Sequence, residues 1–441
     1  MKTLGAAAVI TAALCALIAP VRASSTFRTF APRVASPERL VPADDEVIVQ
    51  FRDEAGERDM DEAMHVAGGK TLRRSAFGKR FLVHLDAGFT AQEAMARLRT
   101  APGVAFAETN GRVTASQSRP GFLTPNDPFY DAQWNMRLVD AERTWGIQTG
   151  SSDVIVAVLD TGIAFEDFGP FRKAPDWGST RFVAGFDFVN GDSHPNDDEF
   201  HGTHVSSTIA EATNNRTGMS GLAFGCAIMP VKVLDDEGNG SFFDVAEGID
   251  FAVQNGAKVI NMSLGGPDNS VSVRQAVDRA VQAGVTLVAA AGNDGVGRVD
   301  FPAALPNVIG VGAVDGRKVL APYSNFGSQI DVVAPGGDTR RDDDFDGLRD
   351  AVFQQMPDPD FVDIGRYDVF GYFGLQGTSM ASPHVAAMAA LLYSQGITQP
   401  AAIQAAIEQT AEDLGAAGRD DRFGHGLIRP SQALRGLGLA R

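Results

Sequence analysis

Cysteine is scarce in this sequence, and its placement excludes one class of protein. Only two cysteines occur in 441 residues, Cys15 and Cys226. Cys15 lies in the first apolar run of the chain, so removal of that run would leave Cys226 without an intramolecular partner. A disulfide framework is therefore excluded, and we expect a hydrophobic core, with or without a bound metal ion, to stabilise the fold.

Long apolar runs and positive charge are also scarce. No run of 18 apolar residues follows the first twenty residues, so we expect no membrane association once the N-terminus is removed. The formal charge is −17, and residues 118–441 carry −19 while residues 1–117 carry +2. Such an acidic chain repels phosphate backbones, which excludes nucleic acid as the expected partner, whereas clustered carboxylates suit Ca²⁺.

The first 23 residues have the pattern of a signal peptide. Lys2 precedes an apolar stretch over residues 4–17 that is short for a membrane span, and Val21-Arg22-Ala23 predicts cleavage after Ala23. We therefore expect a secreted protein, extracellular or periplasmic. An uncleaved membrane anchor is the alternative.

The next part of the chain predicts a linker and then a small folded unit. Residues 24–43 lack periodicity, and residues 44–116 alternate between strand-like and helix-like patterns. Thr90 and Glu93 form a capping box at the start of the second helix. The order favours a small α+β domain. The expected strands are 46–51, 80–85 and 103–108, and the expected helices are 59–67 and one beginning at about residue 90.

From residue 117 to 441 the pattern predicts an α/β domain. Short, nearly continuous apolar strands alternate with helices, which is typical of a mostly parallel sheet covered on both faces, in three layers. The expected strands are 154–159, 227–233, 259–262, 285–290 and 308–313, and the expected helices are 203–211, 243–254, 272–283, 379–394 and 400–410.

Three segments of this domain carry the residue types of nucleophilic catalysis. Asp160 follows a buried strand, His201 begins a helix after an acidic loop, and Ser379 lies at a helix N-terminus. A serine hydroxyl needs an adjacent base, and that base needs an orienting carboxylate. In a doubly covered parallel sheet such residues gather at the carboxyl ends of the strands. The chain order Asp, His, Ser is one of three known for this constellation.

Here the sequence resembles the subtilisin-like serine proteases, in their thermitase-like branch, over about residues 125–430. Five motifs in the expected order carry the resemblance: Asp160-Thr161-Gly162, His201-Gly202-Thr203-His204, residues 260–266 (INMSLGG), Ala290-Ala291-Gly292-Asn293 and residues 377–383 (GTSMASP).

The resemblance implies a serine endopeptidase that acts on peptides or proteins. Ser379 attacks the carbonyl, His201 transfers the proton, Asp160 orients the histidine, and Asn293 donates to the oxyanion. A substrate strand binds between two edges. The substrate residues implied are Gly238, Asn239 and Gly240 on one edge, Ser263, Leu264 and Gly265 on the other, Phe242 and Val245 in an apolar pocket, and Ala290, Ala291 and Asp300 around the pocket for the residue before the scissile bond.

Two readings of Asp300 stay open at this point. Its carboxylate either attracts Lys or Arg into that pocket, or turns to solvent or to a backbone amide, which leaves a pocket for large apolar residues.

Residues 44–110 resemble the inhibitor-like propeptide of the family. The resemblance implies a zymogen whose own propeptide is its intramolecular inhibitor, with self-cleavage expected in the aperiodic stretch 111–124, and we expect a monomer. Two rival functions remain, an inactive secreted calcium-dependent binding protein on the same fold and an esterase with the same triad.

Three acidic clusters are candidates for Ca²⁺. The first and second follow from the resemblance, and the third has oxygen ligands at alternate positions with Gly347 at the sixth, although Phe353 stands where an EF-hand has Glu. The ligands are Asp127, Asp176, Asn215 and the carbonyls of Ala212, Thr217 and Met219 for the first; Asp187, Asp192 and Asn196 for the second; and Asp342, Asp344, Asp346 and Asp350 for the third.

Overall fold

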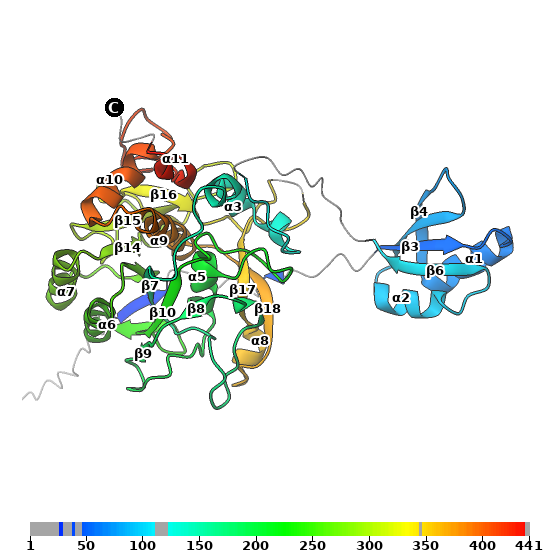
Figure 1. The fold of residues 1–441 in the computed structure, drawn as a ribbon, viewed down its shortest axis with the longest axis horizontal. Coiled ribbons are helices and arrows are strands. Elements are labelled where there is room, and N and C mark those ends of the chain that lie inside the picture. Colours follow the sequence, from blue (N-terminus) through cyan, green and yellow to red (C-terminus); the bar gives the residue numbers. More distant parts are fainter. Residues whose placement is uncertain (1–25, 30–37, 40–45, 111–121, 344–345, 437–441) are drawn as a thin grey trace, which may run out of the picture.

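The computed structural model describes residues 26–29, 38–39, 46–110, 122–343 and 346–436 (Figure 1). For the first two segments only the backbone is described. The expected signal peptide, most of the expected cleavage stretch and Asp344 lie outside the described residues. Within the described part, no helix combines the length and the apolar character needed to cross a membrane.

Residues 46–110 form a small α+β unit, as the pattern predicts. Four antiparallel strands have the order β4-β5-β3-β6, and two helices pack on the sheet around Val47, Val49 and Leu98. Glu93 N–H donates to Oγ1 of Thr90 at 3.3 Å, which is the expected cap. The sequence analysis missed β4, because its residues are polar and mostly exposed. The elements are β3 (Glu46–Phe51), α1 (Glu57–Ala67), β4 (Gly69–Arg74), β5 (Arg80–Leu85), α2 (Ala91–Leu98) and β6 (Val104–Thr109).

The larger unit is built on an eight-stranded, parallel sheet. Its order is β16-β15-β14-β12-β7-β10-β8, and β9 also pairs with β10. The strands are β7 (Ile155–Asp160), β8 (Arg181–Phe182), β9 (Phe186–Asp187), β10 (Ala227–Lys232), β12 (Val259–Met262), β14 (Thr286–Ala290), β15 (Val308–Val314) and β16 (Val332–Pro335).

Helices cover both faces of this sheet, so the predicted three-layer α/β architecture is confirmed (Figure 1). Along β7, Val156 and Val158 face one core, with α5 and α9, whereas Ala157 and Leu159 face the other, with α6 and α7. Both faces of the strand are buried, which explains its continuous apolar sequence. The helices are α3 (Trp134–Leu138), α4 (Ala141–Trp145), α5 (His201–Ala210), α6 (Phe242–Gln254), α7 (Val271–Gln282), α8 (Pro359–Val362), α9 (Thr378–Ser394), α10 (Pro400–Thr410) and α11 (Pro430–Leu434).

Two smaller antiparallel sheets lie beside the main one. In the first, β17 (Val352–Pro357) and β18 (Phe370–Leu375) form a pair, and β2 (Glu38–Arg39) adds to the edge of β18. In the second, β1 (Thr26–Thr29) lies between β11 (Asn239–Ser241) and β13 (Leu264–Gly265). The sequence analysis predicted none of these pairings. Segments as short as β1, β2, β11 and β13, paired across long distances in the chain, leave no periodic signal.

Candidate functional site

Asp160 is the last residue of β7, at the carboxyl end of the central sheet. It is fully buried, and its Oδ1 accepts from Nδ1 of His201 at 2.6 Å and from the N–H of Thr161 at 2.8 Å. These two donors fix the carboxylate, and the short contact fixes the imidazole ring with one nitrogen toward Asp160.

His201 is the first residue of α5 and is also buried. The preceding Phe200 has φ 154°, in the region that glycine favours. Burial alone would lower the pKa of His201, but Asp160, Glu199 and Asp197 together raise it above its usual value. Nε2 of His201 is buried and has no hydrogen-bond partner within the described residues. The ring is therefore held on one side and can exchange a proton on the other.

Ser379 lies in the first turn of α9, a helix that is buried from Thr378 to Leu392. Its hydroxyl donates to the main-chain carbonyl of Ser263 at 3.1 Å, and the hydroxyl of Ser263 donates to the carbonyl of Ser379 at 2.8 Å. The first turn of a helix presents free N–H groups and a partial positive charge. Ser379 thus lies beside an expected substrate edge, at the helix end that presents these donors.

Asn293 is held by the same turn. Its Oδ1 accepts from the N–H and the hydroxyl of Thr378, at 2.9 and 3.0 Å. With the oxygen occupied, Nδ2 is left as a buried donor that has no partner in the described part of the chain. A buried donor without a partner is costly, so this amide is suited to an oxygen that arrives with a ligand.

The two expected substrate edges are short strands that do not pair with each other. Asn239 and Gly240 lie in β11, directly after Gly238, and Leu264 and Gly265 form β13 directly after Ser263. A Cβ at Gly240 would lie 2.3 Å from the carbonyl oxygen of Val233, so only glycine fits there. Phe242 and Val245 occupy the first turn of α6, next to β11, and Val245 is buried.

Ala290 and Ala291 are buried at the carboxyl end of β14, near Asp300. The Asp300 carboxylate is neither solvent-facing nor unpaired: its side chain is 4% exposed and lies 3.2 Å from the guanidinium of Arg298. Burial raises the pKa of Asp300, and Arg298 partly offsets this. Its Oδ2 lies 2.8 Å from where a Cβ at Gly292 would stand. Neither sequence reading anticipated an internal cationic partner.

Three charged residues around the site were not singled out from the sequence. Asp197 accepts from Oγ1 of Thr161 and from the N–H of Thr203, at 2.9 Å each, and so ties the Asp160 loop to α5. Glu199 accepts from the N–H of His201 at 2.8 Å, and burial raises its pKa to about 8. The run of acids before His201 was the available signal, but it was interpreted only as part of a calcium cluster.

The third of these residues is Lys232. It is the last residue of β10 and lies opposite Asp160 in the register of the parallel strands β10 and β7. It is fully buried, and its ammonium donates to the carbonyls of Thr161 and Leu234 and to Asp198, at 2.6 to 2.7 Å. A buried cation with three acceptors holds the end of the sheet together.

The carboxylates of the first acidic cluster are buried beside Tyr372 of β18 and the loop after α5, whereas Asn215 and Thr217 of this loop are exposed. The Asp127 carboxylate accepts from the N–H groups of Asn214 and Asn215, and Asp176 accepts from Nδ2 of Asn215 at 2.7 Å and from the N–H of Met219 at 3.0 Å. Burial raises the pKa of Asp176 to about 6. The carbonyls expected to contribute belong to Ala212, Thr217 and Met219, in this same loop.

A carboxylate that the sequence analysis did not assign adjoins this cluster. Glu211 is fully buried beside Asp176. Burial, followed by the neighbouring Asp176 and Asp127, raises its pKa well above the usual value. Such crowding of acidic groups is unfavourable unless a proton or a cation is shared between them.

In the second cluster the side chains are engaged locally. Asp187 accepts from the N–H groups of Val189 and Asn190 at 2.8 Å, and Asp192 accepts from the N–H of His194 at 2.8 Å. Asn196 donates from Nδ2 to Glu166 at 3.0 Å, which leaves its buried Oδ1 without a partner in the described chain.

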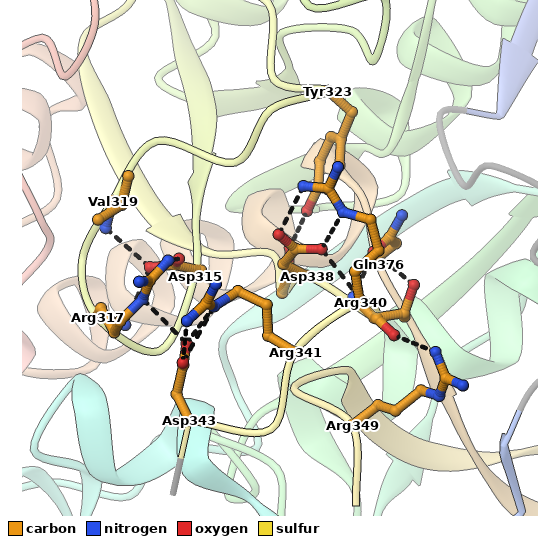
Figure 2. A network of polar contacts seen from close by, with 12 residues as sticks. Asp315, Arg317, Val319, Tyr323, Asp338, Arg340, Arg341, Asp343, Arg349 and Gln376 are labelled. Atoms are coloured by element: carbon orange, nitrogen blue, oxygen red, sulfur yellow. Dashed lines mark hydrogen bonds and ion pairs between the residues drawn. The ribbon is translucent and has the colours of Figure 1, made fainter.

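The third cluster adjoins a network of arginines (Figure 2). Asp343 lies between Arg341 and Arg317, at 2.5 and 3.1 Å, and Asp338 pairs with Arg340 at 2.8 Å. Asp343 therefore points to cations of the protein itself and cannot also serve a loop-bound metal.

Two of the proposed ligands of the third cluster, Asp346 and Asp350, accept hydrogen bonds from backbone N–H groups rather than from arginine side chains. Asp346 accepts from the N–H of Leu348 at 2.8 Å, Asp350 accepts from the N–H of Asp343 at 3.0 Å, and one buried oxygen of Asp342 has no partner among the described residues. Across the described residues, no three His, Cys, Asp or Glu side chains converge into a metal cage by themselves. Any calcium site here needs carbonyl or amide oxygens as well.

Comparisons with known proteins agree with this fold. Residues 151–426 match the model of the subtilase family, and residues 31–110 match that of the fervidolysin N-terminal prodomain. Together with the parallel sheet, these matches define an α/β serine endopeptidase with an N-terminal prodomain. The chain belongs to the subtilase family.

Individual relatives cover most of the chain. A thermophilic serine proteinase of Bacillus sp. (strain AK1) is 35% identical over 86% of this chain and 85% of that protein. Thermitase of Thermoactinomyces vulgaris is 38% identical over 67% of this chain and 94% of its own length. Among solved structures, a protease of Pseudoalteromonas arctica PAMC 21717 matches 71% of this chain and 99% of its own, with a TM-score of 0.62 and 31% identity.

Proposed function

We propose that this serine endopeptidase works through Asp160, His201 and Ser379. The observation that carries the proposal is the 2.6 Å contact between Nδ1 of His201 and Asp160, which leaves the buried Nε2 as the only ring nitrogen able to exchange a proton. Ser379 attacks the peptide carbonyl, His201 takes its proton and returns it to the leaving amine, and Asp160 stabilises the imidazolium. Hydrogen bonds between nucleophile and base often form fully only with substrate bound.

The oxyanion is stabilised by Asn293 and by the helix that carries Ser379. The Asn293 oxygen is occupied by Thr378, so Nδ2 is directed as a donor, and the N–H of Ser379 in the first turn of α9 is the second donor. The peptide lies as an added strand between β11 and β13, with Phe242 and Val245 below one residue of the substrate.

Calcium fits the first acidic cluster best. Asp127, Asp176 and Glu211 bring three carboxylates into one region, where burial and the neighbouring acids raise the pKa of Asp176 and of Glu211. Bound there, Ca²⁺ would neutralise this charge and be held by Asp127, Asp176, Asn215 and the carbonyls of the loop. The second and third clusters fit less well, because each includes an exposed carboxylate, Asp192 in the second and Asp346 in the third, whereas Asp127 and Asp176 are both buried.

We further propose that the protein is secreted and matures by its own activity. The expected leader ends at Ala23, and the prodomain match extends to residue 110, directly before the expected cleavage stretch 111–124. A labelled fluorophosphonate, which reacts with activated serines, tests the proposal: it should label the processed enzyme and fail to label Ser379→Ala. Absence of labelling in the processed enzyme, beside intact folding, would support the inactive-protein alternative instead.

A further inference from the structure

The groove between β11 and β13 is not vacant in the full chain. A segment from the N-terminus, β1, lies between the two edges as the middle strand of a three-stranded antiparallel sheet. It appears as the dark blue arrow beside α6 in Figure 1. Thr26, Phe27 and Arg28 lie opposite Ser241, Gly240 and Asn239 on one side, and Arg28 and Thr29 lie opposite Gly265 and Leu264 on the other.

The direction of β1 is that of a substrate approaching the nucleophile. Thr29 lies opposite Leu264, and the residue that precedes Leu264 is Ser263, whose carbonyl accepts the hydroxyl of Ser379 at 3.1 Å. The C-terminal end of β1 therefore points to Ser379. A substrate needs the same direction, because the residues before its scissile bond must lead up to the attacked carbonyl.

A second pairing holds the same part of the chain on the enzyme. Glu38 and Arg39 of β2 lie opposite Gly374 and Phe373 of β18, the strand that leads directly into Thr378 and Ser379. The pairings of β1 and β2 strengthen each other, because the two strands are joined by a short stretch of chain. Once one strand has paired, the other pairs intramolecularly, at an effective concentration of about 1 mM for a short linker. A four-residue strand that would bind weakly as a free peptide can thus stay in place.

The groove has room for one strand, so occupancy by β1 excludes any other peptide. This includes the stretch 111–124 at the end of the prodomain, which is the occupant expected from the sequence. Within the described residues, β11 and β13 pair with no named strand other than β1, and edges of this kind bind an extended chain readily.

We propose that residues 26–29 are a built-in ligand of the substrate groove and keep external peptides out of the precursor. Only Ser24 and Ser25 lie between these residues and the expected leader. The inference rests on the proposed function for the identity of the groove. It adds a second inhibitory segment, outside the small prodomain. External peptide should gain access, and the expected cut in 111–124 should become possible, only after β1 has left.

The test uses the full-length precursor with Ser379→Ala, which cannot process itself. Arg28 pairs with both edges, so Arg28→Pro removes an N–H from the middle of the sheet, whereas Arg28→Lys keeps it and is the matched control. The probe is a fluorescein-labelled peptide with the sequence of residues 25–30, Ser-Thr-Phe-Arg-Thr-Phe, followed by fluorescence anisotropy. We expect Arg28→Pro to bind it at least tenfold more tightly than the parent and Arg28→Lys.

Hydrogen exchange provides a second measurement on the same proteins. The amides of residues 239–241 and 264–265 should exchange faster in Arg28→Pro than in Arg28→Lys. Equal peptide affinity and equal exchange would overturn the proposal. The unlabelled peptide should also compete with casein for the processed, active enzyme. If the peptide competes with casein for the processed enzyme but Arg28→Pro changes neither peptide affinity nor hydrogen exchange in the precursor, only the proposed role of β1 is wrong. If it neither competes nor binds any form, the groove is not the substrate site and the proposed peptide-binding mode fails too.

Discussion

Asn293 and Thr378 are joined by two hydrogen bonds, because the N–H and the hydroxyl of Thr378 both donate to Oδ1 of Asn293, at 2.9 and 3.0 Å. The amide is thereby oriented with Nδ2 directed away from Thr378, although 85 residues separate the two positions. The nucleophile turn thus orients the proposed oxyanion donor, and a change in either residue should affect turnover more than binding.

Asn293→Ala should lower kcat by about 10²–10³ with little change in KM, the range found for the side-chain oxyanion donor of a subtilisin. Thr378→Val keeps the N–H and loses only the hydroxyl, so we expect a loss of about tenfold or less. Steady-state kinetics on a peptide nitroanilide would measure both. A loss in Asn293→Ala that appeared in KM alone would contradict the role of the amide.

Glu199 should make stability depend on pH. Burial raises its folded-state pKa to about 8 from a usual 4.5, so the folded protein holds this proton more tightly than the unfolded chain does. The stability that Glu199 contributes is fully present below about pH 4.5. It is lost progressively as pH rises above that value, and the loss is complete once pH has risen through about 8. Glu199→Gln, which keeps an acceptor for the N–H of His201, should therefore gain stability relative to the parent between pH 5 and 8, by at most about 4 kcal/mol.

This difference is measured by denaturant unfolding in the Ser379→Ala background, which prevents autolysis. Glu247→Gln, on the exposed face of α6, is the control and should change nothing. Parallel pH curves for the parent and Glu199→Gln would show that Glu199 is ionised in the folded protein across this range.

Arg298 should set the preference for the substrate residue before the scissile bond. It pairs with the buried carboxylate of Asp300 at 3.2 Å, so the charge of this carboxylate is compensated and the expected pocket should prefer large apolar residues. Arg298→Ala leaves Asp300 buried and unpaired, which a substrate Lys or Arg would relieve. We expect kcat/KM for such peptides to rise about tenfold relative to Phe peptides, with Arg298→Lys unchanged. An identical cleavage profile for Arg298→Ala would rule out this arrangement.

Calcium should stabilise the folded protein through the first acidic cluster. A ligand present at 100 times its Kd stabilises the native state by about 2.7 kcal/mol, so a chelator should lower Tm by several degrees. Asp176→Asn should abolish most of this response, and Asp346→Ala should remove a smaller part if the third loop also binds. Thermal unfolding in the Ser379→Ala background, with metal analysis of the purified protein, checks this. An unchanged Tm and no bound metal would contradict it.

The sequence predicted the α/β architecture well because both cores leave a clear pattern. Val156, Ala157, Val158 and Leu159 face alternate cores, so the whole strand is apolar and easily recognised. The convergence of Asp160 and His201 follows from the same rule, since strand ends and helix starts meet at one edge of a parallel sheet.

The features that could not be predicted from the sequence depend on contacts between distant segments or on the direction of single side chains. The direction of the Asp300 side chain toward Arg298 is a single rotamer choice, and no sequence pattern records it. Glu199 and Glu211 were not singled out from the sequence, and the fold buries both. The insertion of β1 into the groove involves four residues that pair over 200 positions away, which leaves no periodic signal.

The most direct test of the central claim is the intact mass of the purified chain with and without Ser379. The account predicts that the parent converts itself to a shorter active form cut between residues 111 and 124, whereas Ser379→Ala, purified alone, keeps the prodomain and hydrolyses no casein. Normal maturation of purified Ser379→Ala, or casein hydrolysis by it, would contradict the account.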